Sequence, residues 1–166
     1  MSQPIHPTQA GNQAPSNAVS WTDPARQALF DQWLAALAST FGLLPHSVST
    51  ASADASFRRY LRVKNASGAS FIIMDAPPDK EDCRPFVHVQ KLLKEAAVLS
   101  PEVLAWDEPN GFMLITDFGD QTLIGLLDPE APAKANDWYL QAVDTLIDWQ
   151  KASRPGVLPE YNDALL

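Results

Sequence analysis

Three arginines on one short segment are the side chains of this sequence best suited to bind an anion. Arg58, Arg59 and Arg62 lie within five consecutive positions. Guanidinium groups stay charged at physiological pH and form paired hydrogen bonds to carboxylate or phosphate oxygens. The cluster therefore indicates that an anion lies near this segment. The alternative is that these side chains are solvated on the surface of a strand.

A β-hairpin from Ala53 to Pro78 is the element that positions these arginines. Apolar and polar residues mostly alternate over residues 57–63, as in a strand with one buried face, and Arg59 interrupts the apolar row. Residues 71–74 form an unbroken apolar run, which is typical of a strand covered on both sides. Residues 64–69 contain Asn and Gly and supply the turn.

Signals along the rest of the chain complete an α+β pattern. Asp23 and Pro24 predict the N-cap and the first position of a helix that stops at Gly42. The order of elements predicts a five-stranded antiparallel sheet with one helix between its third and fourth strands, and a long helix afterwards. The other elements expected are strands near 48–52, 101–106 and 112–116 and helices near 84–97 and 138–150.

Composition narrows the classes of function. The chain has 166 residues, 46% of them apolar, and a formal net charge of −8, so neither nucleic acid nor a membrane is expected as a partner. Cys83 is the only cysteine, which rules out an internal disulfide and favours a cytoplasmic location. Met1–Ser20 has few large apolar residues and is expected to be a disordered tail without a signal peptide. His6 and His88 lack partners at ligand spacing, so no metal site is expected.

Three short motifs carry a resemblance to a known family. Ser52–Tyr60 reads Ser-Ala-Asp-Ala-Ser-Phe-Arg-Arg-Tyr, Met74–Pro78 reads Met-Asp-Ala-Pro-Pro, and Cys83–Phe86 reads Cys-Arg-Pro-Phe. With these motifs, residues 24–166 resemble the aminoglycoside phosphotransferase and choline kinase-like family of small-molecule kinases. Within it they look most like the bacterial kinases that phosphorylate the anomeric hydroxyl of N-acetylmuramate and N-acetylglucosamine. The resemblance implies a protein-kinase-like small lobe followed by the first helix of a truncated large lobe.

The resemblance implies a phosphate-binding loop at the start of the hairpin. Asp54, Ala55 and Ser56 match the flap over the nucleotide phosphates, where small residues let backbone N–H groups approach phosphate oxygens. Arg58 and Arg59 follow directly and are expected to assist with charge. The alternative for this loop is a plain β-turn.

A hinge after the last strand is the second element that the resemblance implies. Thr116 matches the backbone carbonyl, and Phe118 the backbone N–H, that bind the adenine edge, while Met74 and Phe118 are expected to form apolar walls. Protein kinases carry Asp-Phe-Gly at a magnesium site after the catalytic loop, but residues 117–119 directly follow a strand, which favours the hinge. Asp75 is expected either to act as a functional carboxylate or to cap the strand end.

Two departures from the family pattern limit what the resemblance implies. The phosphate-binding lysine of the third strand is missing, because Met74 and Asp75 stand where it is expected. No His-x-Asp-x-x-x-x-Asn segment occurs in the 166 residues, so the catalytic base and the magnesium ligands are expected in a large lobe beyond Leu166. The sequence therefore predicts part of a kinase that contains no catalytic residue and is inactive by itself.

These observations predict four segments: a tail at 1–20, a nucleotide-binding lobe at 21–116, a hinge at 117–120 and the start of a helical lobe at 121–166. The expected cofactors are ATP and magnesium, and the expected substrate is a small amino sugar. The expected activity of the whole protein is ATP-dependent phosphorylation of N-acetylmuramate or N-acetylglucosamine in cell-wall recycling. The alternatives are a kinase for aminoglycosides, choline or homoserine, and a non-catalytic kinase-like interaction module.

Overall fold

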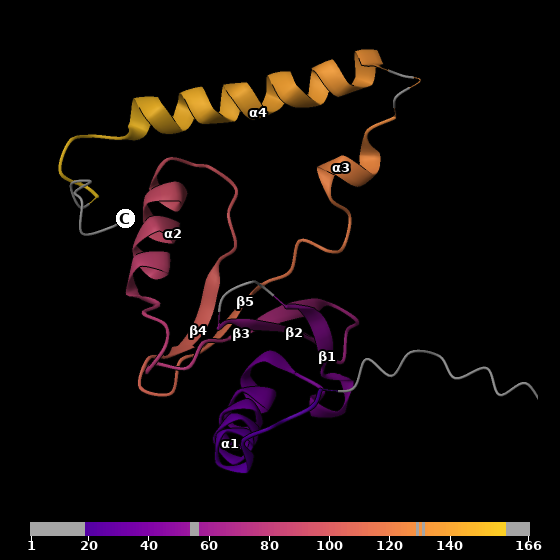
Figure 1. Cartoon of the computed structure of the whole chain (residues 1–166), viewed down its shortest axis with the longest axis vertical. Coiled ribbons are helices and arrows are strands. Elements are labelled where there is room, and N and C mark those ends of the chain that lie inside the picture. The colour runs from indigo at the N-terminus through magenta and orange to yellow at the C-terminus, as the bar shows by residue number, and fades with distance from the viewer. Residues whose placement is uncertain (1–18, 54–56, 129, 131, 159–166) are drawn as a thin grey trace, which may run out of the picture.

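A five-stranded sheet is the central element of the computed structural model, which describes residues 19–53, 57–128, 130 and 132–158. The strands lie in the order β1-β2-β3-β5-β4, and all neighbouring pairs are antiparallel, so the predicted sheet is confirmed. Helix α1 packs on one face and α2 on the other, while α3 and α4 extend beyond the sheet (Figure 1). The elements are α1 (Pro24–Phe41), a 3₁₀ turn (Pro45–Ser47), β1 (Ser49–Ala53), β2 (Arg59–Lys64), β3 (Ser70–Asp75), α2 (Arg84–Glu95), β4 (Val103–Asp107), β5 (Phe112–Thr116), α3 (Leu123–Leu126) and α4 (Pro132–Ala152).

Helix α1 begins and ends where the sequence predicts. The Asp23 carboxylate accepts hydrogen bonds from two backbone N–H groups of the first turn, which would otherwise lack partners. Gly42 ends the helix in the left-handed conformation, with φ of 65°, where glycine carries no steric penalty. Phe30 and Leu34 lie four residues apart on one side of the helix and are buried against the sheet.

Alternation along the strands divides the core into two clusters. Successive side chains of a strand point to opposite faces, so the neighbours Ile73 and Met74 belong to different clusters. The α1 face of the sheet carries the buried residues Leu61, Val63, Ile73, Phe112 and Leu114. The opposite face, called the α2 face below, carries Met74, Met113 and Ile115, which pack with Cys83 and Val87.

The turn between β4 and β5 packs tightly on the end of β3. Gly111 has φ of 70°, and a Cβ atom there would lie 1.9 Å from the carbonyl oxygen of Ala76. The Gly111 carbonyl accepts a hydrogen bond from the Ala76 N–H at 2.9 Å. Any side chain at position 111 is therefore incompatible with this contact.

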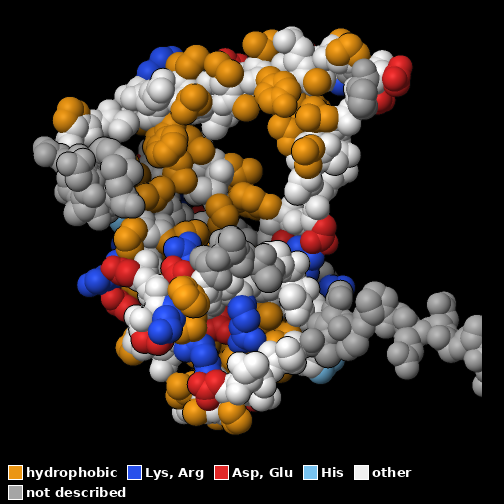
Figure 2. Space-filling view, viewed as in Figure 1, with side chains coloured by type: hydrophobic (Ala, Val, Ile, Leu, Met, Phe, Trp, Pro, Cys, Tyr) orange, Lys and Arg blue, Asp and Glu red, His pale blue; other side chains and the backbone are white. Residues whose placement is uncertain are grey.

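The helical segment after the sheet is longer than the sequence predicts. Helix α4 begins at Pro132 rather than near 138, since proline suits the first helical turn, where its missing N–H costs no hydrogen bond. No helix in the described ranges is long and apolar enough to cross a membrane. Figure 2 shows hydrophobic atoms along α3 and α4 around an open space, and the exposed side chains of these helices include Ile124, Trp138, Tyr139, Leu140, Val143, Leu146 and Ile147.

The structure describes only two residues of the predicted tail at 1–20. Val19 packs against the cluster on the α1 face. The Ser20 carbonyl accepts a hydrogen bond from the Arg59 guanidinium at 3.0 Å. These two residues therefore belong to the packed part of the chain.

Candidate functional site

A cavity of about 470 Å³ lies on the α2 face of the sheet, beside the segment that follows β5. Neighbouring strands supply Tyr60, Ile72 and Ile115 as walls, and Phe118 borders the cavity with 57% of its surface exposed. Apolar and aromatic walls with a few polar groups are typical of a small-molecule site. We call this cavity the hinge pocket, and its lining residues are Ala51, Ser52, Tyr60, Arg62, Ile72, Pro101, Ile115, Thr116, Asp117, Phe118, Gly119, Asp120 and Thr122.

The side chain of Asp117 fixes the predicted hinge to the sheet. Arg62 donates to both of its carboxylate oxygens, at 2.6 and 3.1 Å, and the Ser70 hydroxyl donates to Oδ2 at 2.7 Å. The Gly119 N–H donates to Oδ1 at 2.8 Å, and the third guanidinium nitrogen of Arg62 donates to Asp120 at 2.6 Å. Both strands of the hairpin therefore hold residues 117–120 in one conformation.

The charges of this network favour the ionised form of its central carboxylate. Burial raises the pKa of Asp117, whose side chain is only 2% exposed, but the hydrogen bonds from Arg62, Ser70 and Gly119 outweigh burial and hold that pKa below its ordinary value. The same contacts raise the pKa of Arg62. Asp117 and Arg62 are therefore both charged at any pH near neutrality, and we call this ion pair the hinge clamp.

The backbone beside this clamp includes both bonded and unbonded groups. The Thr116 N–H and hydroxyl are both bonded to the backbone of Glu102, which fixes the end of β5. In the described ranges, no group accepts a hydrogen bond from the Phe118 N–H. Thr116 and Phe118, both predicted site residues, border the same pocket. Among the described residues, the Phe118 N–H is therefore left available to a ligand in the pocket.

Arg58 lies on the α2 face, where it pairs with the loop before α2. Its Nε atom donates to the Glu81 carboxylate at 3.1 Å, and the other Glu81 oxygen accepts a hydrogen bond from the Phe57 N–H at 3.2 Å. Burial lowers the pKa of Arg58, but hydrogen bonds to Tyr60 and Glu81 outweigh it and raise that pKa. Since Tyr60 also borders the hinge pocket, Arg58 lies near the pocket's edge.

Arg59 and Asp75, two further predicted site residues, lie on the opposite face. Asp75 is 1% exposed and accepts hydrogen bonds from Arg59 at 2.9 Å and from Arg26 of α1 at 2.8 Å. Arg59 also stacks on the ring of Trp21, 4.1 Å from its centroid. The structure therefore does not bring Arg59 and Asp75 together with Thr116 and Phe118. The sequence indicated an anion near Arg58, Arg59 and Arg62, and in the structure each of these arginines pairs with a carboxylate of the protein itself.

The remaining predicted site residues lie away from the pocket or outside the described ranges. Met74 is fully buried on the α2 face and is not among the residues that border the pocket. Asp54, Ala55 and Ser56 fall outside the described residues. Sequence reasoning did not name Tyr60 as a site residue, because strand register, rather than sequence spacing, brings it to the pocket.

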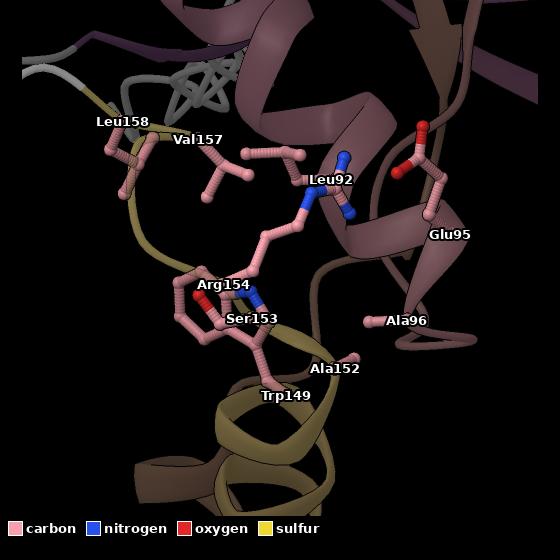
Figure 3. A pocket seen from close by; sticks show the side chains of 9 residues that line it. All are labelled: Leu92, Glu95, Ala96, Trp149, Ala152, Ser153, Arg154, Val157 and Leu158. Carbon is pink, nitrogen blue, oxygen red and sulfur yellow. The ribbon is translucent and has the colours of Figure 1, made fainter.

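A second cavity, of about 260 Å³, lies between α2 and the end of α4. Figure 3 shows Leu92 and Glu95 of α2 and Ala96 just after it on one side, with Arg154 reaching across from the segment after α4. His88 also joins the two segments, since its Nε2 atom lies 2.6 Å from the Val157 carbonyl oxygen. This cavity lies where the end of α4 and the segment after it approach α2, and most of its lining residues are apolar.

The described residues hold no group of three or more His, Cys, Asp or Glu side chains placed to bind a metal ion. Asp117 and Asp120, the carboxylates that border the hinge pocket, are both engaged by Arg62. Both carboxylates of the pocket are therefore already paired with a cation of the protein.

Comparison with known proteins gives three relatives that carry the same name. The chain is 43% identical over 147 residues to a protein of Pseudomonas aeruginosa named N-acetylmuramate/N-acetylglucosamine kinase. Proteins with the same name are 44% identical over 120 residues in Pseudomonas putida and 43% identical over 113 residues in Neisseria meningitidis serogroup B. These matches cover 88%, 72% and 68% of the chain.

The matches cover most of this chain but less than half of each relative. The chain spans only 40%, 34% and 33% of the length of these three relatives. The pattern of the phosphotransferase enzyme family matches residues 47–165, which include the sheet from β1 onward, the hinge pocket and α4. The five-stranded sheet with its inserted helix has the architecture of a kinase-like small lobe, in agreement with that match. The chain belongs to the phosphotransferase enzyme family.

Proposed function

We propose that this chain is the ATP-binding part of a small-molecule kinase, with a nucleotide-binding lobe at 21–116, a hinge at 117–120 and the start of a helical lobe at 121–166. The hinge pocket is the observation that carries this proposal. It combines a volume of about 470 Å³, apolar walls and a rigid backbone segment on one side. Those are the requirements for binding a purine through its edge and its two faces.

The nucleotide has one orientation that fits these features. The base lies between Ile72, Ile115 and Phe118, with its edge toward the backbone of residues 116–118. The phosphates then extend along β1 and β2 toward the loop at 54–56. In that loop, backbone N–H groups of small residues are expected to meet phosphate oxygens.

The names of the relatives support N-acetylmuramate or N-acetylglucosamine as the acceptor. In the reaction, the anomeric hydroxyl oxygen of the sugar bonds to the γ-phosphorus of ATP, and the bond from that phosphorus to the bridging oxygen of ADP breaks. The hydroxyl proton passes to a base. We propose that this base and the magnesium ligands lie outside the described residues, and that the reaction belongs to cell-wall recycling in the cytoplasm.

Calorimetry with the 166-residue chain tests the nucleotide site. ATP and adenosine are both expected to bind, and Phe118→Ala, which removes an exposed wall of the pocket, is expected to weaken both. Arg84→Ala is a surface control, because Arg84 is 71% exposed and its ion-pair partner among the described residues is Asp82. A folded chain that binds neither ligand would contradict the proposal and favour a non-catalytic interaction module.

The acceptor is tested on the gene product that contains this chain. Radiolabelled ATP is supplied with N-acetylmuramate, N-acetylglucosamine, an aminoglycoside, choline and homoserine. We expect labelled product only with the amino sugars, and the product should lose its reducing end, because the anomeric hydroxyl is the one modified. Labelling of only an aminoglycoside, choline or homoserine would remove the amino-sugar assignment.

A further inference from the structure

The segment between α2 and β4 encloses another cavity, of about 260 Å³, which is separate from the hinge pocket and from the cavity beside α4. The chain turns back after the end of α2 and returns to the sheet at Val103 (Figure 1). Gln90 and Lys94 of α2 form one wall of the cavity, and residues 97–100 and 102 form the other. We call this cavity the α2–β4 pocket.

Hydrogen bonds at both ends hold the returning segment in place. At the helix end, Ala97 takes the left-handed conformation with φ of 55°, and the Val98 N–H donates to the Leu93 carbonyl at 2.9 Å. At the strand end, the Glu102 N–H donates to the Thr116 hydroxyl at 3.0 Å, and the Thr116 N–H donates to the Glu102 carbonyl at 3.1 Å. The cavity between these two ends is therefore preformed.

Gln90 is the buried polar side chain of this pocket. It is 8% exposed, and no hydrogen bond in the described ranges involves its side-chain amide. Among the described residues, Trp106 Nε1 is the one unbonded side-chain N or O atom of a buried or half-buried residue that is closed off from solvent. The unbonded amide atoms of Gln90 therefore remain open to the cavity that they border. Because a buried amide without a partner is costly, this one points to a ligand.

The two charged residues of the pocket neutralise each other. Lys94 and Glu102 form an ion pair, with side chains that are 67% and 46% exposed. The other lining residues carry no charge and are Gln90, Ala97, Val98, Leu99 and Ser100. A pocket without net charge favours a neutral ligand, since an unpaired charge would lose its hydration on entering.

The amide of Gln90 selects the kind of neutral group that fits. A glutamine side chain accepts a hydrogen bond at its carbonyl oxygen and donates from its nitrogen, so its partner must offer a donor and an acceptor side by side. A peptide residue in the extended conformation does so, because its N–H and C=O point to the same side, as they do toward a neighbouring antiparallel strand.

We propose that the α2–β4 pocket is a second binding site, for a small neutral peptide-like molecule in which one apolar residue lies between two amide groups. Gln90 pairs with the N–H and C=O of that residue, whose side chain packs on Val98 and Leu99. Leu99 is 85% exposed in the free chain, so the ligand also covers apolar surface. The site does not depend on the proposed nucleotide site, because the two pockets share no lining residue.

The test uses acetyl-leucine methylamide, the smallest molecule with these features, on the ¹⁵N-labelled 166-residue chain. Nuclear magnetic resonance titration is expected to shift the side-chain amide signal of Gln90, with a Kd of about 1 to 10 mM for so few contacts. The diester analogue, methyl 2-acetoxy-4-methylpentanoate, keeps the shape but has no N–H donor, and should bind at least about fivefold more weakly. Adenosine should not displace the probe. No shift at Gln90, equal binding of the diester, or displacement by adenosine each overturns the proposal.

A pair of variants tests the role of the amide itself. Gln90→Met keeps the length of the side chain without its polar atoms, and is expected to weaken the probe at least about fivefold. Its urea midpoint should not fall, because the amide has no partner in the free chain. Lys91→Ala, at an exposed position of α2 outside the pocket, is the control and should leave the affinity unchanged. Unchanged affinity in Gln90→Met, or a lowered midpoint, overturns the proposal, since the amide would then serve nothing or serve the fold.

A longer probe distinguishes a small molecule from a polypeptide. A pentapeptide that extends acetyl-leucine methylamide by two alanines on each side offers the same central residue and additional amides. It is expected to bind no more tightly than the short probe, because the pocket has only about 260 Å³. Binding at least about tenfold tighter would overturn the assignment to a small molecule and identify a polypeptide as the ligand.

Discussion

The Nε atom of Arg26 lies 2.8 Å from Oδ1 of Asp75, although 49 positions separate the two residues in the chain. Asp75 is buried at the end of β3, and its second oxygen accepts a hydrogen bond from Arg59 at 2.9 Å. Arg26 belongs to α1 and also donates to the Asn110 carbonyl at 3.1 Å. One carboxylate thus fastens the first helix to the strand at the centre of the sheet.

Replacing this carboxylate is expected to destabilise the fold. Asp75→Asn leaves two guanidinium groups facing each other without a counter-charge, so the free energy of unfolding should fall by about 3 kcal/mol, with partial exposure of Arg59 limiting the loss. Urea unfolding of the variant measures this, with Asp79→Asn at an exposed position as the control. Unchanged stability with weaker ATP binding would instead make Asp75 a nucleotide ligand, as one interpretation of the sequence holds.

The hinge clamp is expected to control binding of the base. Asp117→Asn weakens the hold of Arg62 on residues 117–120, so both ATP and adenosine should bind about tenfold more weakly. A loss common to both ligands would indicate that the clamp acts on binding of the base rather than of the phosphates. Asp120→Asn is the control, because that carboxylate is 80% exposed and should contribute little. Full adenosine affinity in Asp117→Asn would contradict a role of the clamp in positioning the hinge.

The same carboxylate predicts a pH dependence of stability. The pKa of Asp117 is lower in the folded chain than its ordinary value, so its ionised form stabilises the fold above about pH 4. This contribution is lost as the pH falls below that value and through the folded-state pKa. Urea unfolding at several pH values should show the wild type and Asp117→Asn converging as the pH falls from 6 to about 3. A constant difference between them would show that ionisation of Asp117 does not contribute.

Two glycines offer a matched test of the turn between β4 and β5. Gly68 and Gly111 both have positive φ, of 88° and 70°, but a Cβ atom meets the Ala76 carbonyl only at position 111. Gly68→Ala should therefore cost about 1 kcal/mol of stability, from backbone strain alone. Gly111→Ala should cost at least about 1 kcal/mol more, because the turn must also move away from β3. Thermal unfolding of both variants measures the difference, and equal losses would contradict the close packing.

The elements of the fold could be predicted wherever local chemistry decides them. Asp23 and Gly42 mark the two ends of α1, because capping depends on residue type and backbone conformation at one place. The apolar runs of β3 and β5 identify these segments as central strands, because a strand covered on both faces has apolar residues at consecutive positions. The start of α4 was less well predicted, because Pro132 precedes the apolar face that identifies the helix.

The site could be predicted only in part, because partner choice depends on strand register and on the two faces of the sheet. The positions of Thr116, at the end of β5, and Phe118, just after it, could be expected from the apolar run of the strand, and both residues border the pocket. Alternation in the sequence predicts that the adjacent Arg58 and Arg59 face opposite sides of the sheet, but it does not say which carboxylate each one meets. Alternation along a strand separates them, and only the folded positions of Glu81 and Asp75 reveal their partners.

The buried position of Cys83 allows local opening of this lobe to be measured by thiol labelling. Cys83 is the only thiol of the chain, it is 7% exposed at the start of α2, and burial raises its pKa. Thiol reagents attack the exposed, ionised form, so the labelling rate counts the excursions in which the start of α2 leaves the sheet. Cys83 lies in the segment that joins β3 to α2 and packs against the sheet, so a nucleotide that stabilises this lobe is expected to slow the reaction. The labelling rate of Cys83, compared with and without ATP, therefore measures how often the start of α2 separates from the sheet.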